Sequence, residues 1–181
     1  MSRDRTTRLS HTQVMAAAER RERRERRSRW TTMAILAVLV FAADQALKIT
    51  IRAVYAEGEG TDLTGWLRIA RVTNEGIAFG LFPGRQGVVA TITVLALCGI
   101  AVAIAGLVRR NPWAAAGAGF LVGGSLGNLL DRVFHSGVTD YVDFSRWPAF
   151  NLADVAIGIG AVLIVMGLLE ASEEDAEDPA T

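Results

Sequence analysis

Polar side chains able to do acid–base chemistry are concentrated between Gly123 and Gly160, a stretch flanked by two long apolar runs. Ionisable groups at the edge of a membrane are costly and are rarely retained without a function. We therefore expect the chemistry of this protein to take place here. The residues concerned are Asn128, Asp131, Arg132, Asp140, Asp143, Asn151 and Asp154.

Two neighbouring aspartates can hydrolyse a peptide bond without a metal ion. One carboxylate acts as the general base and activates a water molecule. The other carboxyl is protonated, polarises the peptide carbonyl and later helps to protonate the leaving amine. Two carboxyl groups in contact do not easily both ionise, so they share a proton. A site made wholly of carboxylates could also hold magnesium or calcium.

Other hydrolytic mechanisms have less support. The segment Gly123–Gly127 reads GGSLG and formally matches GxSxG, but it lies within an apolar helical run rather than at a strand-to-helix turn. The nearest histidine, His135, is in a predicted loop. The two histidines are far apart and Cys98 is the only cysteine, so neither a zinc site nor a disulfide framework is expected. We predict no metal and no cofactor.

Four apolar runs must position these residues, and their lengths are typical of membrane-spanning helices. The sequence predicts an all-α membrane protein with four transmembrane helices and a small extracytoplasmic β-rich element between helices 1 and 2. We predict that the chain consists of a basic tail (1–29), a transmembrane domain (30–170) and an acidic tail (171–181). Within that domain the spans are about 31–51, 86–108, 113–131 and 150–169, and the outer loops are 52–85 and 132–149.

Two of the predicted helices carry recognisable interaction patterns. Asp44 and Lys48 are four residues apart in the first span, so they share a helical face and can form an ion pair. Gly119, Gly123 and Gly127 recur every fourth residue in the third span. Such a stripe of small residues lets another helix approach closely.

The first outer loop contains a predicted strand. Apolar and polar residues alternate over Leu67–Val72. The following Asn74–Gly76 is typical of a turn. Residues Ile77–Phe82 are expected to return as a second strand or to lie on the membrane surface.

The charges at the two ends predict the orientation. Ten arginines lie within the first 29 residues, and Arg109 and Arg110 lie between the second and third spans. By the positive-inside rule both regions are cytoplasmic. The acidic tail, which begins at Glu170, returns to the cytoplasm and is expected to be disordered. The basic tail lacks interleaved aromatic residues, so no nucleic-acid partner is expected; it is compatible with contact to membrane lipids.

This topology gathers the polar residues of the spans and loops in the outer half of the membrane or just above it. The cytoplasmic halves of the spans carry no ionisable residue. Because a charge at the bilayer centre costs roughly 2.5–3.5 kcal/mol on insertion scales, such convergence indicates a site. The converging residues are Asp44, Lys48, Asn74, Asn128, Asp131, Arg132, Asp140, Asn151 and Asp154.

Five segments, taken together and in order, resemble the motif blocks of lipoprotein signal peptidase, also called signal peptidase II. The last three of them are the most specific as a set. The segments are DQALK (44–48), TNEGIAFG (73–80), GNLLDR (127–132), GVTDYVDF (137–144) and FNLAD (150–154).

The resemblance implies an aspartic endopeptidase of the bacterial cytoplasmic membrane, with its active site near the outer face. The family cleaves signal peptides from prolipoproteins immediately before a cysteine that carries a diacylglyceryl group. Its second catalytic aspartate falls on Asp154. Its first falls on Asp140, the ninth residue after Asp131, with Asp143 as the alternative.

The resemblance also implies supporting roles around this pair. Asn74 and Gly76 belong to the outer-loop motif, and Asn128, Arg132 and Asn151 support the substrate and the aspartates. Apart from the resemblance, we expect Asp131 to form an ion pair with its neighbour Arg132 at the helix end. Asp44 and Lys48 stabilise the end of the first span. Leu47 stands where the family usually has a hydroxyl residue, which leaves the role of the Asp44–Lys48 pair open.

Asp154 follows Asn151 by three residues and lies in the first turn of a helix, whose dipole favours an anion. We therefore predict that Asp154 holds the negative charge and Asp140 the shared proton.

The alternative function is a small four-span transporter with carboxylates as proton relays. The expected partners are diacylglyceryl-modified prolipoproteins and membrane lipids, and the protein is expected to act as a monomer.

Overall fold

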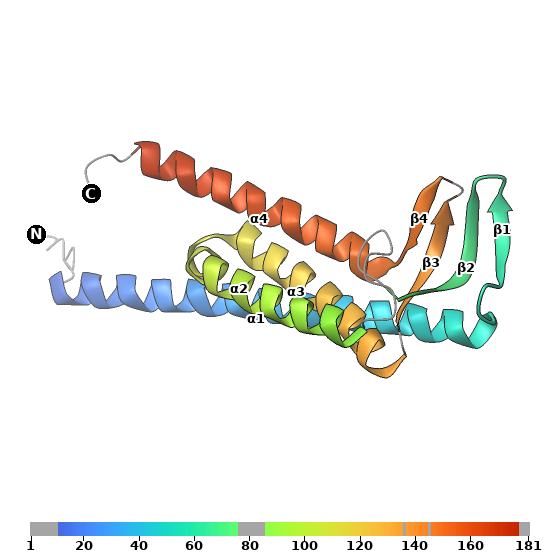
Figure 1. The fold of residues 1–181 in the computed structure, drawn as a ribbon. Helices are drawn as coiled ribbons and strands as arrows, with labels where there is room; N and C mark the ends of the chain where they lie inside the picture. The colour runs from blue at the N-terminus through green and yellow to red at the C-terminus, as the bar shows by residue number, and fades with distance from the viewer. Residues whose placement is uncertain (1–10, 76–85, 136, 145, 178–181) are drawn as a thin grey trace, which may run out of the picture.

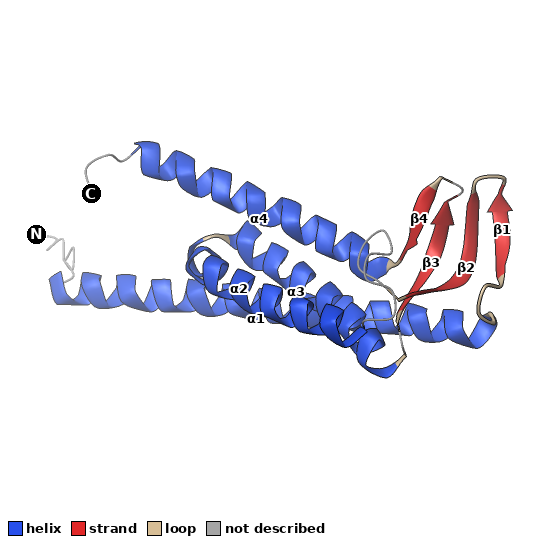
Figure 2. Cartoon of the chain, in the orientation of Figure 1, coloured by secondary structure: helices blue, strands red, loops and turns tan. Residues whose placement is uncertain are grey.

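The computed structural model describes residues 11–75, 86–135, 137–144 and 146–177. Four helices and one four-stranded sheet make up these residues (Figures 1 and 2). The predicted turn residue Gly76 and the segment 77–82 lie outside the described residues. The helices are α1 (His11–Val54), α2 (Gln86–Arg110), α3 (Pro112–Phe134) and α4 (Leu152–Glu177).

Three of the four helices contain windows long and apolar enough to cross a membrane, as judged over the described residues. These windows lie in Thr12–Val54, Pro112–Phe134 and Leu152–Glu173. Helix α2 has 25 residues and stands where the second span is predicted. The fold is therefore mostly helical with three candidate membrane-crossing helices, and a fourth crossing by α2 stays a prediction.

Helix α3 is the central packing element, because glycines on two of its faces admit two other helices. A Cβ on Gly123 would lie 2.6 Å from the carbonyl oxygen of Ala37 in α1. A Cβ on Gly124 would lie 2.5 Å from the carbonyl oxygen of Ala153 in α4. The predicted glycine stripe thus packs against α1, and a second glycine face, which begins with Gly117, packs against α4.

The four strands form one antiparallel sheet in the order β1-β2-β3-β4, at the end of the helices where α1 finishes (Figure 1). Strand β2 confirms the predicted strand over Leu67–Val72 and extends it to Asn74. The strands are β1 (Gly60–Thr64), β2 (Leu67–Asn74), β3 (Val138–Phe144) and β4 (Trp147–Phe150).

The β-rich element is predicted between helices 1 and 2 alone, but β3 and β4 lie within the predicted outer loop 132–149 and complete the sheet. Val72 of β2 pairs with Asp140 of β3, and Asn74 pairs with Val138. A two-stranded hairpin is only marginally stable, whereas a sheet of three or more strands can hold together. The β-rich element is therefore shared between the segment after α1 and the segment after α3.

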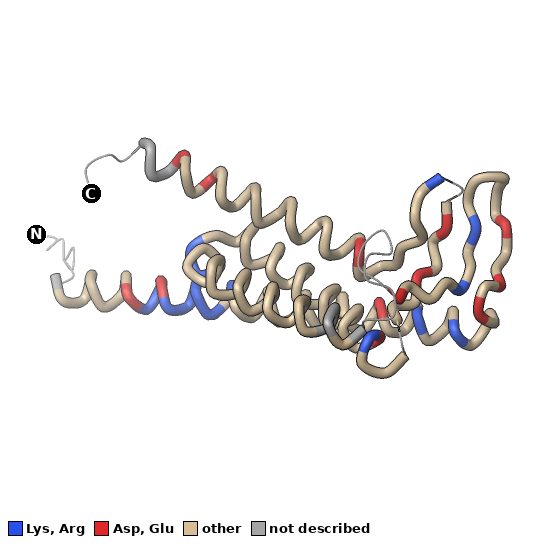
Figure 3. The backbone as a smooth tube through the Cα atoms, viewed as in Figure 1, with Lys and Arg blue, Asp and Glu red and all other residues tan. Residues whose placement is uncertain are grey.

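Both charged tails are helical where they are described. Helix α1 runs without a break from the arginine-rich segment into its apolar part (Figure 3). Helix α4 continues to Glu177 (Figure 1). The expectation of disorder from Glu170 onward is wrong over residues 170–177. Alanine and glutamate are good helix formers, and extending an existing helix avoids the cost of nucleation. Glu170 also accepts a 2.6 Å hydrogen bond from Asn111 Nδ2.

Candidate active site

Asn151 and Asp154 form a capping box at the start of α4. Asn151 is the residue immediately before the helix, and its Oδ1 accepts the Asp154 backbone N–H at 3.0 Å. In return, Asp154 Oδ2 accepts the Asn151 backbone N–H at 3.2 Å. Two N–H groups that a helix start leaves unpaired are thereby satisfied. The Asp154 carboxylate is fixed beside the positive end of the helix dipole and remains exposed.

Asp140 approaches the same point from the sheet. It lies in β3, is 1 % exposed and accepts a hydrogen bond from Asn151 Nδ2 at 2.6 Å. Asn74, at the end of β2, donates its Nδ2 to the other carboxyl oxygen of Asp140 at 3.1 Å. Asn151 therefore contacts both candidate catalytic aspartates.

The environment of Asp140 favours its protonated form. Burial raises the pKa of this carboxyl from 3.8 to about 7, and the negative charge of Asp154 acts in the same direction. The hydrogen bonds from Asn74 and Asn151 oppose this rise in the pKa only in part. Asp140 and Asp154 thus interact as a coupled pair in which the buried member holds a proton more readily than an ordinary aspartate.

Asn128 of α3 joins these groups to α1. Its Nδ2 donates to Asp154 Oδ1 at 2.8 Å, and its Oδ1 accepts from Lys48 Nζ at 2.7 Å. Asn151 Nδ2 also lies 3.2 Å from the same Asn128 oxygen. The asparagine side chains consequently link α1, α3, α4 and β3 into one hydrogen-bonded network.

A buried ion cluster lies behind this network. Lys48 Nζ is 2.9 Å from Asp44 Oδ2 and 3.4 Å from Asp131 Oδ2, and none of these three side chains is exposed. The predicted pairing of Asp44 with Lys48 is confirmed. Removing one charge from such a cluster leaves the others buried without compensation. Leu47, the departure from the usual motif, is 43 % exposed and therefore lies off this buried face.

The prediction that Asp131 pairs with Arg132 needs correction. The carboxylate of Asp131 binds cations of α1 instead, with Arg52 Nη1 at 3.1 Å in addition to Lys48. A helix places adjacent residues about 100° apart, so Asp131 and Arg132 lie on different faces of α3, and it is Asp131 that contacts α1. Arg132 donates to the carbonyl of Asn128 at 3.3 Å and interacts electrostatically with Asp154 first, then Asp140 and Asp131.

Asp44 connects the ion cluster to the start of α4. Its Oδ1 accepts the backbone N–H of Ala153 at 3.0 Å, one of the unpaired groups of the first helical turn. Gln45 Nε2 bridges Asp44 Oδ2 and the carbonyl of Gly127 at 3.1 and 3.2 Å. The first turn of α4, which carries Asp154, is therefore held directly by α1.

Asp143 lies apart from this network. It is three residues from Asp140, and an odd offset along a strand places two side chains on opposite faces of the sheet. Asp143 pairs in register with Arg68 and lines a hollow with Asp62 and Leu67. The geometry therefore favours Asp140 over Asp143 as the partner of Asp154.

Several residues of the site were not singled out from the sequence. Arg52 Nη1 donates to Thr139 Oγ1 at 2.8 Å, and the Thr139 backbone N–H donates to Asp131 Oδ2 at 2.9 Å. The hydroxyl of Tyr141 accepts the backbone N–H of Leu152 at 3.0 Å, and burial raises the Tyr141 pKa to about 12. Arg52 follows Lys48 by four residues, so helical periodicity was the available signal for it. Thr139 and Tyr141 carried no such signal.

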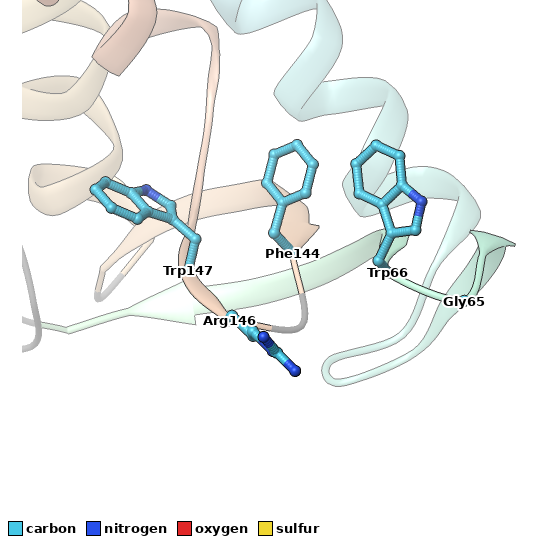
Figure 4. Close-up of a pocket in the computed structure, with 5 residues that line it drawn as sticks. All are labelled: Gly65, Trp66, Phe144, Arg146 and Trp147. Carbon is cyan, nitrogen blue, oxygen red and sulfur yellow. The ribbon is translucent and has the colours of Figure 1, made fainter.

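A hollow of about 720 Å³ lies on the sheet, between Trp66 and Trp147 (Figure 4). Phe144 stands between them and stacks on Trp66 with ring centroids 5.5 Å apart. Both tryptophans are about 60 % exposed. Within the described residues, no group of three or more histidine, cysteine, aspartate or glutamate side chains is placed to hold a metal ion.

The sequence model of Signal peptidase (SPase) II matches residues 36–170 of the chain, which include every residue of the network described above. The chain belongs to the signal peptidase II family. It is therefore an enzyme of a peptidase family, and the resemblance noted from its motifs is confirmed.

Relatives of known name agree with this assignment. A lipoprotein signal peptidase of Pelotomaculum thermopropionicum is 36 % identical over 140 residues, covering 77 % of this chain and 92 % of that protein. A lipoprotein signal peptidase of Desulfitobacterium hafniense is 36 % identical over 143 residues, covering 77 % and 95 %. These relatives are bacterial.

Two solved structures, each described as a bacterial membrane enzyme structure obtained by the in meso method, share this fold. The first superposes with a TM-score of 0.68 at 28 % identity and covers 80 % of this chain and 91 % of the other. The second has a TM-score of 0.64 at 29 % identity and covers 77 % and 93 %.

Proposed function

We propose that the protein removes signal peptides from prolipoproteins, cleaving on the N-terminal side of a diacylglyceryl-modified cysteine, with Asp140 and Asp154 as the catalytic pair. The observation that carries the proposal is the position of Asn151, which hydrogen-bonds both carboxyls. These carboxyls come from β3 and from the first turn of α4, which are otherwise separate elements.

The two aspartates have environments that suit different roles. Asp154 is exposed, lies at a helix N-terminus and accepts hydrogen bonds from Asn128 and Asn151, all of which favour a carboxylate. Asp140 is buried and its pKa is raised to about 7. We assign the charge to Asp154 and the proton to Asp140.

The reaction that follows is a general acid–base hydrolysis. Asp154 takes a proton from water, and the water oxygen attacks the carbonyl carbon of the scissile peptide bond. The Asp140 O–H donates a hydrogen bond to the carbonyl oxygen as negative charge develops there. The carbon–nitrogen bond then breaks while the leaving nitrogen receives a proton from the pair, which restores one charged and one protonated carboxyl.

The supporting residues position this pair. Asn74, Asn128 and Asn151 direct their amide groups at the carboxyl oxygens. Lys48, held by Asp44 and Asp131, orients Asn128. Arg132 contributes positive charge beside Asp154. The motif residue Gly76 is proposed for the same site on the family resemblance alone.

We place α2 as a fourth span and the sheet on the outer side of the bacterial cytoplasmic membrane. The arginine-rich start of α1 (residues 20–29) and the two arginines that end α2 lie at the opposite end of the helices from the sheet (Figure 3), which supports cytoplasmic termini. A substrate cysteine could then keep its acyl chains in the bilayer while the peptide bond meets the aspartates near the outer surface. The division into domains at 1–29, 30–170 and 171–181 and the monomeric state are proposed with this arrangement.

The alternative of a proton-coupled transporter is not favoured. Membership of a peptidase family speaks against it. The buried ionisable cluster also lies at the sheet end of the helices, where the Thr139 backbone N–H joins Asp131 to β3, rather than extending along the bundle.

The experiment that tests the proposal supplies a purified, lipid-modified prolipoprotein to the wild type and to Asp140→Asn and Asp154→Asn. We expect the wild type to release the signal peptide with the modified cysteine as the new N-terminus, detected by mass spectrometry. Both variants should lose cleavage by at least a hundredfold. Cleavage by either variant at the wild-type rate would overturn the catalytic pair, and a wild type that does not cut before the cysteine would overturn the substrate.

A further inference from the structure

The arginines of α1 are divided unequally between two faces of the helix. Residues 19–29 contain seven arginines and three glutamates. Four of the arginines fall at positions i, i+3, i+4 and i+7, which is the spacing of a single helical face. We call this set the arginine stripe; its members are Arg20, Arg23, Arg24 and Arg27.

The rest of this helical segment is electrically balanced. Arg21 pairs with Glu25 at 2.9 Å, and Arg29 pairs with the same glutamate at 3.5 Å. Three arginines and three glutamates share these other faces, so their charges cancel. Among the described residues no ion pair is found for the arginine stripe. The net positive charge of the segment is therefore concentrated on one face.

Part of the balanced side, at Glu25 and Arg29, contacts the protein, whereas the stripe faces away from it. Glu25 and Arg29 are half-buried and line a small hollow with Pro112 at the start of α3. Arg29 Nη1 also donates to the Arg109 carbonyl at 2.6 Å, which fixes this side of α1 against the α2–α3 turn. The stripe residues are all exposed.

The position of the stripe along α1 matches the charged layer of a membrane. The apolar part of α1 begins at Trp30. A rise of 1.5 Å per residue puts Arg27 about 4.5 Å and Arg20 about 15 Å from Trp30 along the helix axis, on the side away from the apolar part. Headgroups occupy roughly 5–8 Å beyond the hydrocarbon, and the Debye length adds about 8 Å at physiological ionic strength. The whole stripe thus lies within the field of a lipid surface.

We infer that the arginine stripe of α1 binds anionic phospholipid headgroups at the membrane face where this helix emerges. Guanidinium groups bind phosphate oxygens in pairs of hydrogen bonds, and juxtamembrane clusters of four or more cations are typical of contacts with anionic lipids. The segment precedes residue 36, where the family match begins. The interaction is therefore additional to the peptidase site and does not depend on it.

Two double variants test this inference with the same change in net charge at the same mean depth. Arg20→Gln with Arg27→Gln removes two cations of the stripe. Arg21→Gln with Arg26→Gln removes two cations from the balanced side. At 1.5 Å per residue both pairs average about 10 Å from Trp30, so the face of the helix is the main difference between them.

The measurement is native mass spectrometry of the full-length protein titrated with phosphatidylglycerol or phosphatidylcholine. We expect the wild type to retain phosphatidylglycerol in preference to phosphatidylcholine. Since each cation near a lipid surface contributes about a factor of five, the stripe double variant should lose about tenfold or more in phosphatidylglycerol affinity. The balanced-side variant should lose less than threefold, and both should retain helical content by circular dichroism.

Three outcomes would overturn the inference. Equal losses in the two double variants would mean that only total charge matters. No preference for phosphatidylglycerol would mean that the stripe does not select anionic lipid. Tighter binding to a duplex DNA than to phosphatidylglycerol at the same salt concentration would assign the stripe to nucleic acid instead.

Discussion

Asn151 and Asp154 each accept the other's backbone N–H, at 3.0 and 3.2 Å, while the side-chain amide of Asn151 reaches Asp140 at 2.6 Å. One residue thus starts α4, positions Asp154 and holds Asp140. These functions reside in different atoms: the Oδ1 of Asn151 serves the helix and its Nδ2 serves Asp140. A substitution can therefore separate them.

We expect Asn151→Ser to keep the helix start and lose the link to Asp140. Serine is a good N-cap and can accept the Asp154 N–H, but it has no amide group to reach Asp140 or Asn128. Peptidase activity should fall at least tenfold while the thermal midpoint changes little. Asn151→Ala is the comparison, because it removes both functions and should also destabilise the protein by about 1 kcal/mol. Full activity in Asn151→Ser would show that the amide link is not needed.

The neighbouring aspartates of β3 give a second prediction. Asp140→Asn should reduce turnover by a factor of a hundred or more, because it removes the protonated carboxyl that polarises the carbonyl of the scissile peptide bond. Asp143→Asn should stay within about twofold of the wild type, because Asp143 is on the other face of the strand and pairs in register with Arg68. The reverse pattern, measured on the same lipidated substrate, would assign catalysis to Asp143.

The sequence predicted the site better than the sheet that carries part of it. Asp44 and Lys48, or Asn151 and Asp154, are close along the chain, so helical spacing was enough to relate them. Asp140 and Asn74 are 66 residues apart and meet because β2 pairs with β3. Pairing between distant strands depends on tertiary packing, which propensity does not encode. For the same reason Asp131 was assigned to its sequence neighbour Arg132 rather than to Lys48 and Arg52 of another helix.

A third prediction concerns pH and activity. Because the pKa of Asp140 is raised to about 7, its proton is lost as the pH rises through that value. Turnover should therefore decline above about pH 7, by about tenfold for each unit once the carboxyl is mostly ionised. The initial rate of signal-peptide release between pH 6 and 9 measures this. A flat profile over that range would contradict a catalytic proton on Asp140.

The same pKa predicts how stability changes with pH. A carboxyl whose pKa is 3.8 when unfolded and about 7 when folded binds more protons in the folded state between these values. Its contribution is therefore complete below about pH 4 and is lost as the pH rises to 7, at most roughly 4 kcal/mol. The difference in thermal midpoint between pH 5 and pH 8 should be smaller in Asp140→Asn, which cannot ionise. An equal pH dependence in both proteins would refute this.

Another prediction concerns the buried cluster of Lys48, Asp44 and Asp131. Lys48→Met should destabilise the protein by about 3–5 kcal/mol, because it leaves buried carboxylates with too little positive charge. Arg68→Met is a matched control, since it also removes one cation from an ion pair. Its partner Asp62 is 83 % exposed and 3.8 Å away, so the expected loss is below about 1 kcal/mol. Denaturation in detergent would measure both, and equal losses would mean that burial of the cluster is unimportant.

The last prediction tests the packing that brings α1 and α3 together. A Cβ on Gly123 would lie 2.6 Å from the Ala37 carbonyl oxygen and 3.0 Å from its Cα, so Gly123→Ala must push the helices apart. Because Lys48 of α1 orients Asn128 of α3, this shift should lower both the thermal midpoint and the activity. Gly99→Ala in α2 is the control, since a Cβ there meets nothing within 4 Å and alanine favours a helix. Wild-type stability and activity in Gly123→Ala would show that close contact along this stripe is not required.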